Sequence, residues 1–465
     1  MTAKPLLLLN KHNVYEWALV ISSTVLLAIW PLPGTIALRH FMLLTGFLSA
    51  FQIIRKSDIQ LSSARCWPIW IFSSFFGWLL FHLIFLSSNY PEQLEEMAGL
   101  WIRAFLAAVM ALGLGLVMGK SESSEGGANS KFCMDWFNNL LIVGFGGTTI
   151  IYFIRYLYEI YQTKVWLHFN FYMAPYAGKP PVVIFGAIFF TLILIRLKRS
   201  LLRYLTWNSI AILAIGVVLV IFSEYFANTK NGMAILLAPL AIFLASFIFS
   251  YSWNFKKFII TLIVSVIVCL AGGYVAKKHV EANKAWPFLL EDIKIGIDID
   301  NFHSWKNKDA YPYPKNSQGI VVNVSTYERS AWAVAALRLI KENPLGYGLV
   351  HHSFGALAIK EWPNFHPPIG RFRGASHSGL LDFTLGVGIP GLLLMLIPFG
   401  VAFYRASNQV YFWMQFVRWI FPVILIAYLI TEVSSNHFIE LLFFIVPFCI
   451  GLTLMPIKTE QSASK

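Results

Sequence analysis

The stretch RFRGASHSGLLDFTLGVGIPGLLLMLIPFGVAF, residues 371–403, joins a basic, polar segment to a long apolar run. The apolar run begins after His377, and its length exceeds the roughly 18 residues that indicate a membrane-crossing helix. Backbone groups in lipid must be hydrogen-bonded within the segment, so the run is expected to form a helix and not an isolated strand. The stretch therefore predicts a point at which the chain enters a membrane from a polar loop.

Apolar runs of this kind recur along the whole chain. Its 465 residues are 57% hydrophobic and 13% charged, whereas soluble domains have about 25% charged residues. We therefore predict an all-α polytopic membrane protein with about 12 transmembrane helices. The predicted helices cover residues 14–31, 35–54, 66–88, 99–118, 134–154, 181–197, 206–226, 232–251, 257–275, 378–403, 411–431 and 437–456.

The charges of the short loops predict the topology. Basic residues gather after the second, fourth, sixth and eighth predicted helices, whereas the loop after the third is acidic. By the positive-inside rule, both ends of the chain then lie in the cytoplasm, and the long loop after the ninth helix faces outward. The predicted domains are helices one to nine within 1–275, a loop domain over 276–377, three further helices within 378–456, and a cytoplasmic tail over 457–465.

The long loop is basic, with 13 Lys and Arg against 9 Asp and Glu. Long loops are exempt from the positive-inside rule, so we attribute this charge to binding of an anion such as a phosphate. Residues 276–324 are expected to be irregular. The sequence Ser325-Thr326-Tyr327-Glu328 matches a capping box, which predicts a helix that ends at Asn343-Pro344. A second amphipathic helix is predicted over about His352–Trp362. The apolar stripe of the first helix consists of Trp332, Ala335, Ala336 and Leu339.

His377 lies where the polar loop becomes the apolar helix, with Ser376 as the predicted N-cap. This is the positive end of a helix dipole, which favours a neutral imidazole able to accept a proton. A general base that acts on a sugar hydroxyl needs such a group. The alternative is an ordinary histidine at the membrane interface. Asp382 follows at roughly 140° around the helix, which makes it a poor orienting partner for His377 within that helix.

Arg329 is predicted in the first turn of the loop helix. A cation at a helix N-terminus is unfavourable unless an anion compensates for it. The neighbouring Glu328 is one such anion. A diphosphate is another, because a guanidinium binds phosphate through two parallel hydrogen bonds. The sequence leaves both interpretations open.

Further cations are candidates for binding the same anion. Arg371 and Arg373 flank glycines near the end of the long loop, where a solvated basic turn is the alternative. Lys230 lies in an external turn between the seventh and eighth helices, where a lysine that reaches the interface is the alternative. Arg155 opens a second external segment, 155–180, whose aromatic content suits the headgroup layer.

No metal site is expected. The histidines of the loop have spacings that match no metal-ligand pattern, and the carboxylates are scattered. The four cysteines lie in or beside apolar runs, which argues against a disulfide framework and a thiolate metal site. No cofactor is predicted, and we find no nucleotide-binding motif. The loop histidines considered are His303, His351, His352, His366 and His377.

Several of these segments together resemble the O-antigen ligase and polymerase superfamily. The first is Glu328-Arg329-Ser330-Ala331-Trp332, followed by Asn343-Pro344-Leu345-Gly346-Tyr347-Gly348. The second is Ser376-His377-Ser378-Gly379, followed by Gly386-Val387-Gly388-Ile389-Pro390-Gly391. The resemblance covers the seventh to tenth helices and the loop. Two positions depart from it, because the family usually has Asn where this chain has Ser378, and tends to have Arg near Lys230.

The resemblance implies a GT-C-like glycosyltransferase of the bacterial inner membrane with a large periplasmic loop that carries the site. It implies an O-antigen ligase of lipopolysaccharide biosynthesis, which transfers an undecaprenyl-diphosphate-linked glycan to a sugar hydroxyl of lipid A–core. In that hypothesis His377 is the general base, Arg329 is also catalytic, the anomeric configuration inverts, and no metal takes part. Membrane lipids are further expected partners, and no nucleic acid is expected. The residues expected to contact the diphosphate are Lys230, Arg329, Arg371, Arg373 and Arg155.

Three alternatives stay open from the sequence. An O-antigen polymerase or a protein O-oligosaccharyltransferase of the same superfamily would use the same donor and another acceptor. A transporter of lipid-linked sugars would predict charged or broken helices at the bilayer midplane and internal repeats. A non-catalytic scaffold would use the loop only to dock a partner.

Overall fold

The computed structural model describes residues 11–57, 59–60, 62–123, 128–165, 179–203, 207–248, 276–281, 286–351, 353–366, 374–407, 411–431 and 436–454, with a few isolated residues between 259 and 274. Within these ranges the regular structure is helical, and the strand-like pairing is one isolated bridge between Lys315 and Val321. Eight helices of the described part are long and apolar enough to cross a membrane. The predicted all-α polytopic membrane fold is confirmed.

The helices of the membrane bundle overlap the predicted spans, except that α4 was not predicted and α6 extends beyond 134–154 at both ends. They are α1 (Lys11–Ile29), α2 (Ile36–Lys56), α3 (Trp67–Phe85), α4 (Tyr90–Glu96), α5 (Ile102–Ser123), α6 (Ala128–Thr163), α7 (Pro180–Arg203), α8 (Trp207–Phe226), α9 (Lys230–Ile248), α14 (Gly379–Arg405), α15 (Phe412–Ile430) and α16 (Asn436–Leu454), with a 3₁₀ turn at Ala64–Cys66 and a π-helical turn at Met97–Trp101. The predicted span 257–275 lies mostly outside the described residues.

A buried ion pair connects three helices of the bundle. Arg103 of α5 donates from Nε to Glu440 Oε1 of α16 at 2.5 Å, and Trp30 Nε1, just after α1, donates to the other carboxylate oxygen at 3.0 Å. Glu440 is 3% exposed. A carboxylate within a membrane bundle needs such partners, because leaving it unpaired there is costly. The pair therefore joins the starts of α5 and α16 to the end of α1.

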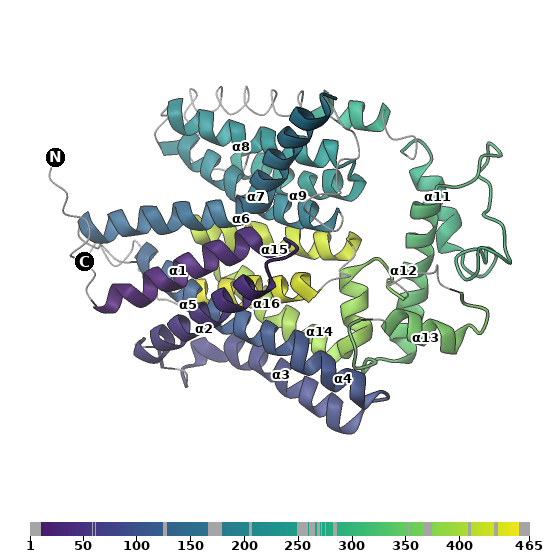
Figure 1. Cartoon of the computed structure of the whole chain (residues 1–465), viewed down its shortest axis with the longest axis horizontal. Coiled ribbons are helices and arrows are strands. Elements are labelled where there is room, and N and C mark those ends of the chain that lie inside the picture. The colour runs from purple at the N-terminus through teal and green to yellow at the C-terminus, as the bar shows by residue number, and fades with distance from the viewer. Residues whose placement is uncertain are drawn as a thin grey trace.

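Three helices lie outside the bundle, at one end of it (Figure 1). They are α11 (Leu289–Ile297), α12 (Val324–Glu342) and α13 (Ser353–Glu361). Their apolar faces form a second core, which also includes residues of α14 and so attaches these helices to the bundle. The members of this core include Trp305, Tyr327, Ala331, Trp332, Ala335, Leu339, Phe354, Leu357, Leu381 and Leu385.

The predicted loop helices are present, with two corrections. The N-cap of α12 is Asn323, whose side chain accepts from the Thr326 N–H at 3.1 Å, so the helix begins before Ser325 and not after it. Arg329 consequently lies in the second turn. The helix ends at Asn343 as predicted, and α13 matches the second amphipathic segment. The expectation that 276–324 is irregular is wrong for α11.

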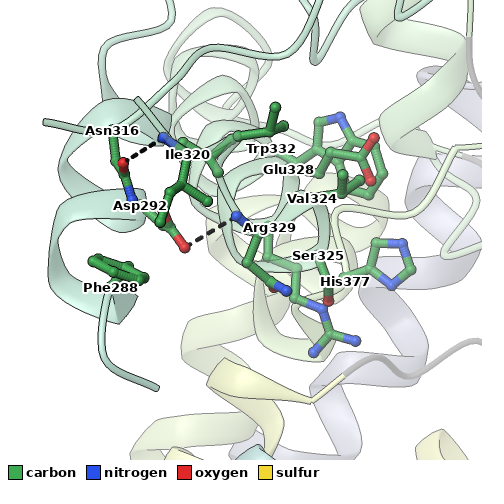
Figure 2. Close-up of a pocket in the computed structure, with 13 residues that line it drawn as sticks. Phe288, Asp292, Asn316, Ile320, Val324, Ser325, Glu328, Arg329, Trp332 and His377 are labelled. Atoms are coloured by element: carbon green, nitrogen blue, oxygen red, sulfur yellow. Dashed lines mark hydrogen bonds between the residues drawn. The ribbon is translucent and has the colours of Figure 1, made fainter. Parts of the chain in front are cut away.

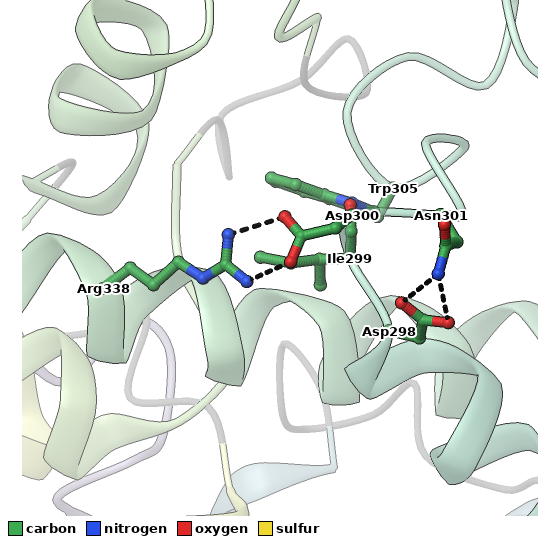
Figure 3. Close-up of polar contacts among 6 residues, drawn as sticks. All are labelled: Asp298, Ile299, Asp300, Asn301, Trp305 and Arg338. Atoms are coloured by element: carbon green, nitrogen blue, oxygen red, sulfur yellow. Dashed lines mark hydrogen bonds and ion pairs between the residues drawn. The ribbon is translucent and has the colours of Figure 1, made fainter.

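A bidentate ion pair ties the segment after α11 to α12. Arg338 donates to both carboxylate oxygens of Asp300 at 2.7 and 2.6 Å (Figure 3). Next to it, the Asn301 amide donates to both oxygens of Asp298. Both partners of the ion pair are well exposed, so it contributes at most about 1 kcal/mol. Its effect is to hold this connection against the outer face of α12.

The run 378–403, predicted as one continuous helix, contains a break. Gly388 has φ 74° and ψ 174°, which is not a helical conformation, and α14 therefore consists of two helical parts. Only glycine adopts such a conformation at low energetic cost. The first part begins at Gly379, two residues after His377, and its Phe383 and Val387 pack in the core of the bundle.

Candidate active site

A cavity of about 850 Å³ lies at the junction of α11, α12 and the start of α14. Figure 2 shows its lining side chains, with Arg329 and His377 on one side and Phe288 and Asp292 on the other. Segments far apart in the sequence meet here. The lining residues are Phe288, Asp292, Asn316, Ile320, Val321, Val322, Asn323, Val324, Ser325, Glu328, Arg329, Trp332 and His377.

His377 is held in a strained backbone conformation beside α12. Its φ is +59°, in the left-handed region, which non-glycine residues seldom adopt. Its ring stacks on the indole of Trp332, with ring centroids 4.9 Å apart and planes 16° apart. Strain of this kind persists only where the surrounding structure imposes it, and it often marks a functional site. The structure thus presents the imidazole to the cavity at a fixed place.

The turn around His377 differs from the prediction. Ser378, and not Ser376, is the N-cap of α14, and its side chain accepts from the Leu381 N–H. The Ser376 N–H donates to Asp382 Oδ1 at 2.8 Å, and Asp382 is 5% exposed. Asp382 therefore acts on the backbone before His377 and holds the turn that orients the histidine.

Arg329 lines the cavity from the second turn of α12. The alternative for this residue was compensation by Glu328. In the structure Glu328 Oε1 accepts a hydrogen bond from the Tyr313 hydroxyl at 2.5 Å, and Glu328 lines the same cavity as Arg329. A half-buried guanidinium in a cavity of this size is suited to bind an anionic group of a ligand.

Lys230 contacts the start of α12, the helix that carries Arg329. It is the first residue of α9, and its Nζ donates to Asn323 Oδ1 at 3.4 Å and to Thr326 Oγ1 at 3.3 Å. Asn323 in turn donates its N–H to Asp292 Oδ2 at 3.1 Å. The start of α9 is thus linked to the wall of the cavity through the cap of α12.

Lys179 is a third cation in this region, and the sequence did not single it out. It precedes α7, and its Nζ donates to the Asn228 carbonyl oxygen at 2.9 Å. Burial lowers the pKa of Lys179, and the positive charges of Lys230 and Arg329 lower it further. Burial followed by the charges of Lys179 and Lys230 also lowers the pKa of His279. Cations that repel one another in a half-buried place indicate a site for an anion.

The other predicted site residues are placed differently. Arg155 is on α6, where its guanidinium lies over the ring of Tyr158 at 5.0 Å, and it is not among the residues that line the cavity. Its contact with a ligand stays a prediction. Arg371 and Arg373 lie outside the described residues.

A protein-family model described as O-antigen ligase matches residues 225–396. This match supports membership of the O-antigen ligase-like superfamily. The matched segment contains Lys230, Arg329 and His377 and ends within α14, so it includes most of the cavity wall. No curated protein matches the chain at the threshold applied. The family indicates a membrane glycosyltransferase-like enzyme that handles lipid-linked glycans.

Lys179 lies outside the segment that matches the O-antigen ligase model. Its replacement tests whether the cations Lys179, Lys230 and Arg329 together bind an anion. Replacing Lys179 by glutamine is expected to raise KM for an anionic lipid-linked donor about tenfold, because a charged contact of about 1.5 kcal/mol is lost. The kcat is expected to change little, since Lys179 does not line the cavity. Initial rates at varied donor concentration measure both. The matched control is Lys164→Gln, whose ammonium lies over the Tyr161 ring.

Proposed function

We propose that this protein is an O-antigen ligase. In this proposal it transfers a glycan from undecaprenyl diphosphate to a sugar hydroxyl of lipid A–core, on the periplasmic face of the bacterial inner membrane. The observation that carries the proposal is one cavity in which Arg329 and His377 converge from two separate parts of the matched segment. A cation and a proton acceptor are the two groups that such a transfer needs.

The reaction follows from the chemistry of these groups. The acceptor hydroxyl gives its proton to the His377 imidazole and its oxygen attacks the anomeric carbon. The bond between that carbon and the diphosphate oxygen breaks, and undecaprenyl diphosphate leaves with the bonding electrons. Attack opposite the leaving group inverts the anomeric configuration. Arg329, supported by Lys230, stabilises the negative charge that develops on the diphosphate, so a metal ion is not required for that role.

Stacking on Trp332 supports the assignment of His377 as the base. The stacked His377 ring cannot rotate freely. Trp332 and Arg329 are both on α12, so the ring nitrogens of His377 keep a constant direction relative to Arg329. A base and an anion-binding group at a constant separation reduce the entropy cost of reaching the transition state. The left-handed backbone conformation of His377 also restricts the direction of its side chain.

The transporter alternative required broken helices, and α14 is broken. However, the backbone groups at this break are buried and hydrogen-bonded to residues of the segment 344–348 and to Trp78. In a transporter the break would supply ligands for substrate or coupling ion. We therefore prefer the transferase.

The test is reconstitution of purified protein with undecaprenyl-diphosphate-linked O-antigen and core-bearing lipid A, in the presence of a chelator. A lipopolysaccharide ladder on a gel is expected. Lengthened donor glycan without a ladder would identify a polymerase. Glycan on an added pilin-like protein would identify a protein-glycosylating enzyme. No change in either lipid, with donor transferred across proteoliposomes, would favour the transporter.

A further inference from the structure

The break in α14 is crossed by the segment that follows α12. The Tyr347 N–H donates to the Leu385 carbonyl oxygen and the Gly348 N–H to that of Gly386, both at 2.8 Å. From the other side of the break, the Ile389 N–H donates to the Pro344 carbonyl oxygen at 2.8 Å. The crossing thus pairs backbone groups that the interrupted helix cannot bond within itself. Unpaired groups of this kind within a span would each cost several kcal/mol.

The two segments touch through glycines that leave no space for a side chain. A Cβ on Gly346 would lie less than 3.0 Å from backbone atoms of Gly386, Val387 and Gly388, and a Cβ on Gly388 would lie equally close to Leu345. Gly346 and Gly388 also have positive φ values, 90° and 74°. Both the space and the conformation therefore require glycine at these two positions.

Side chains of α3 fix the crossing from a third direction. Trp78 Nε1 donates to the Val387 carbonyl oxygen at 2.7 Å. The His82 Nε2 lies 3.2 Å from the Gly346 carbonyl oxygen, and its Nδ1 lies 3.1 Å from Gln93 Nε2. His82 and Gln93 are 2% and 3% exposed. The crossing is therefore anchored to the bundle and not only to the loop.

Both helices that carry the reactive groups run from the cavity to this crossing. Helix α12 runs from Arg329 to Asn343, and the first part of α14 runs from His377 to Gly386. They share one apolar seam, since Ala331 and Ala335 of α12 belong to the same core as Leu381 of α14. Because α12 and the first part of α14 pack against each other and are joined at the crossing, the separation between their starts, near Arg329 and His377, is expected to stay constant.

We propose that the crossing of 344–348 with 386–388 sets the position of His377 relative to Arg329. This inference rests on the proposed transfer reaction and assigns Gly346 and Gly388 as positioning residues, which contact neither substrate. It also gives a role to the Asn343–Gly348 sequence, which lines no part of the cavity. A displacement of about 1 Å at a reacting group can reduce a rate about 10²-fold.

The experiment compares Gly346→Ala and Gly388→Ala with Gly400→Ala in the full-length protein. Gly400 is on the same helix beyond the break, and a Cβ there meets nothing within 4 Å. Each glycine variant at the crossing is expected to lose about 10²-fold in kcat, whereas Gly400→Ala keeps the wild-type value. In a variant that folds, the number of donor molecules bound per protein is expected to stay at the wild-type value. Trp78→Phe, which keeps the ring and removes one hydrogen bond, is a milder variant should the alanine variants fail to fold. Its kcat is expected to fall about tenfold.

A double variant separates positioning from general damage. If the crossing acts through His377, adding Gly346→Ala to His377→Ala is expected to leave the residual rate unchanged within about threefold. A further fall of about 10²-fold would overturn the positioning role, as would wild-type kcat in Gly346→Ala and in Trp78→Phe. If the wild-type protein itself transfers no glycan, the proposed function fails, and the positioning role fails with it. The wild-type lane thus distinguishes the two failures.

Discussion

Replacement of His377 by asparagine is expected to reduce glycan transfer by a factor of about 10² to 10⁴, the usual contribution of a general base. Asparagine tolerates the left-handed backbone that this position requires, so the variant removes the proton acceptor with little added strain. An alanine at this position would both remove the proton acceptor and add backbone strain. The measurement is the initial rate of ladder formation at saturating donor and acceptor, together with KM for the donor.

The matched control for this variant is Ser376→Ala, which removes a hydroxyl from the same turn. The Ser376 backbone N–H, which donates to Asp382, is kept. We expect its rate to stay within a few-fold of wild type, because Ser376, whose hydroxyl donates to the Ser378 carbonyl oxygen and accepts from the Ser378 N–H, does not line the cavity. A His377→Asn variant with wild-type kcat would refute the assignment of His377 as the base.

Arg329→Ala is expected to lower kcat about 10²- to 10³-fold, comparable to the loss of one group that stabilises developing charge. KM for the donor should also rise, because the guanidinium binds the diphosphate before the reaction. Arg329→Lys is expected to recover part of the rate, since lysine keeps the charge and loses the planar fork. Steady-state kinetics with the reconstituted donor provide both constants.

Arg338→Ala is the control for the second prediction. Arg338 is on the same helix and forms an exposed ion pair with Asp300, so its removal should cost at most about 1 kcal/mol of stability and leave kcat unchanged. Equal losses in Arg329→Ala and Arg338→Ala would indicate that α12 is simply damaged, and would remove Arg329 from the mechanism.

The helices that could be predicted are those with a clear apolar period. Trp332, Ala335 and Leu339 recur at helical spacing, and all three are buried in the core that α12 shares with α14. Helix α11 was missed because it is short and the turn signals that follow it dominate the segment. The cap at Asn323 was missed because Ser325 offered a better-known pattern, while the true cap also binds Lys230 from another helix.

The site could be predicted in part. His377 and Arg329 carried a local signal, a polar residue at a helix start, and the structure brings both to one cavity. Lys179 and Asp292 carried none, because their relation to the cavity depends on how α7 and α11 pack. The same holds for the break in α14. Its glycines are visible in the sequence, but the segment that pairs with them is some 40 residues earlier in the chain.

The pairing of 344–348 with the break has a consequence for biogenesis. The earlier segment leaves the ribosome first, so it can be in place when α14 enters the membrane. A chain in which the loop misfolds would present the unpaired backbone of the break to lipid, at a cost that exceeds the marginal stability of most proteins. Quality-control proteases remove such chains. The cell would therefore retain in its membrane mainly those copies whose loop had already folded.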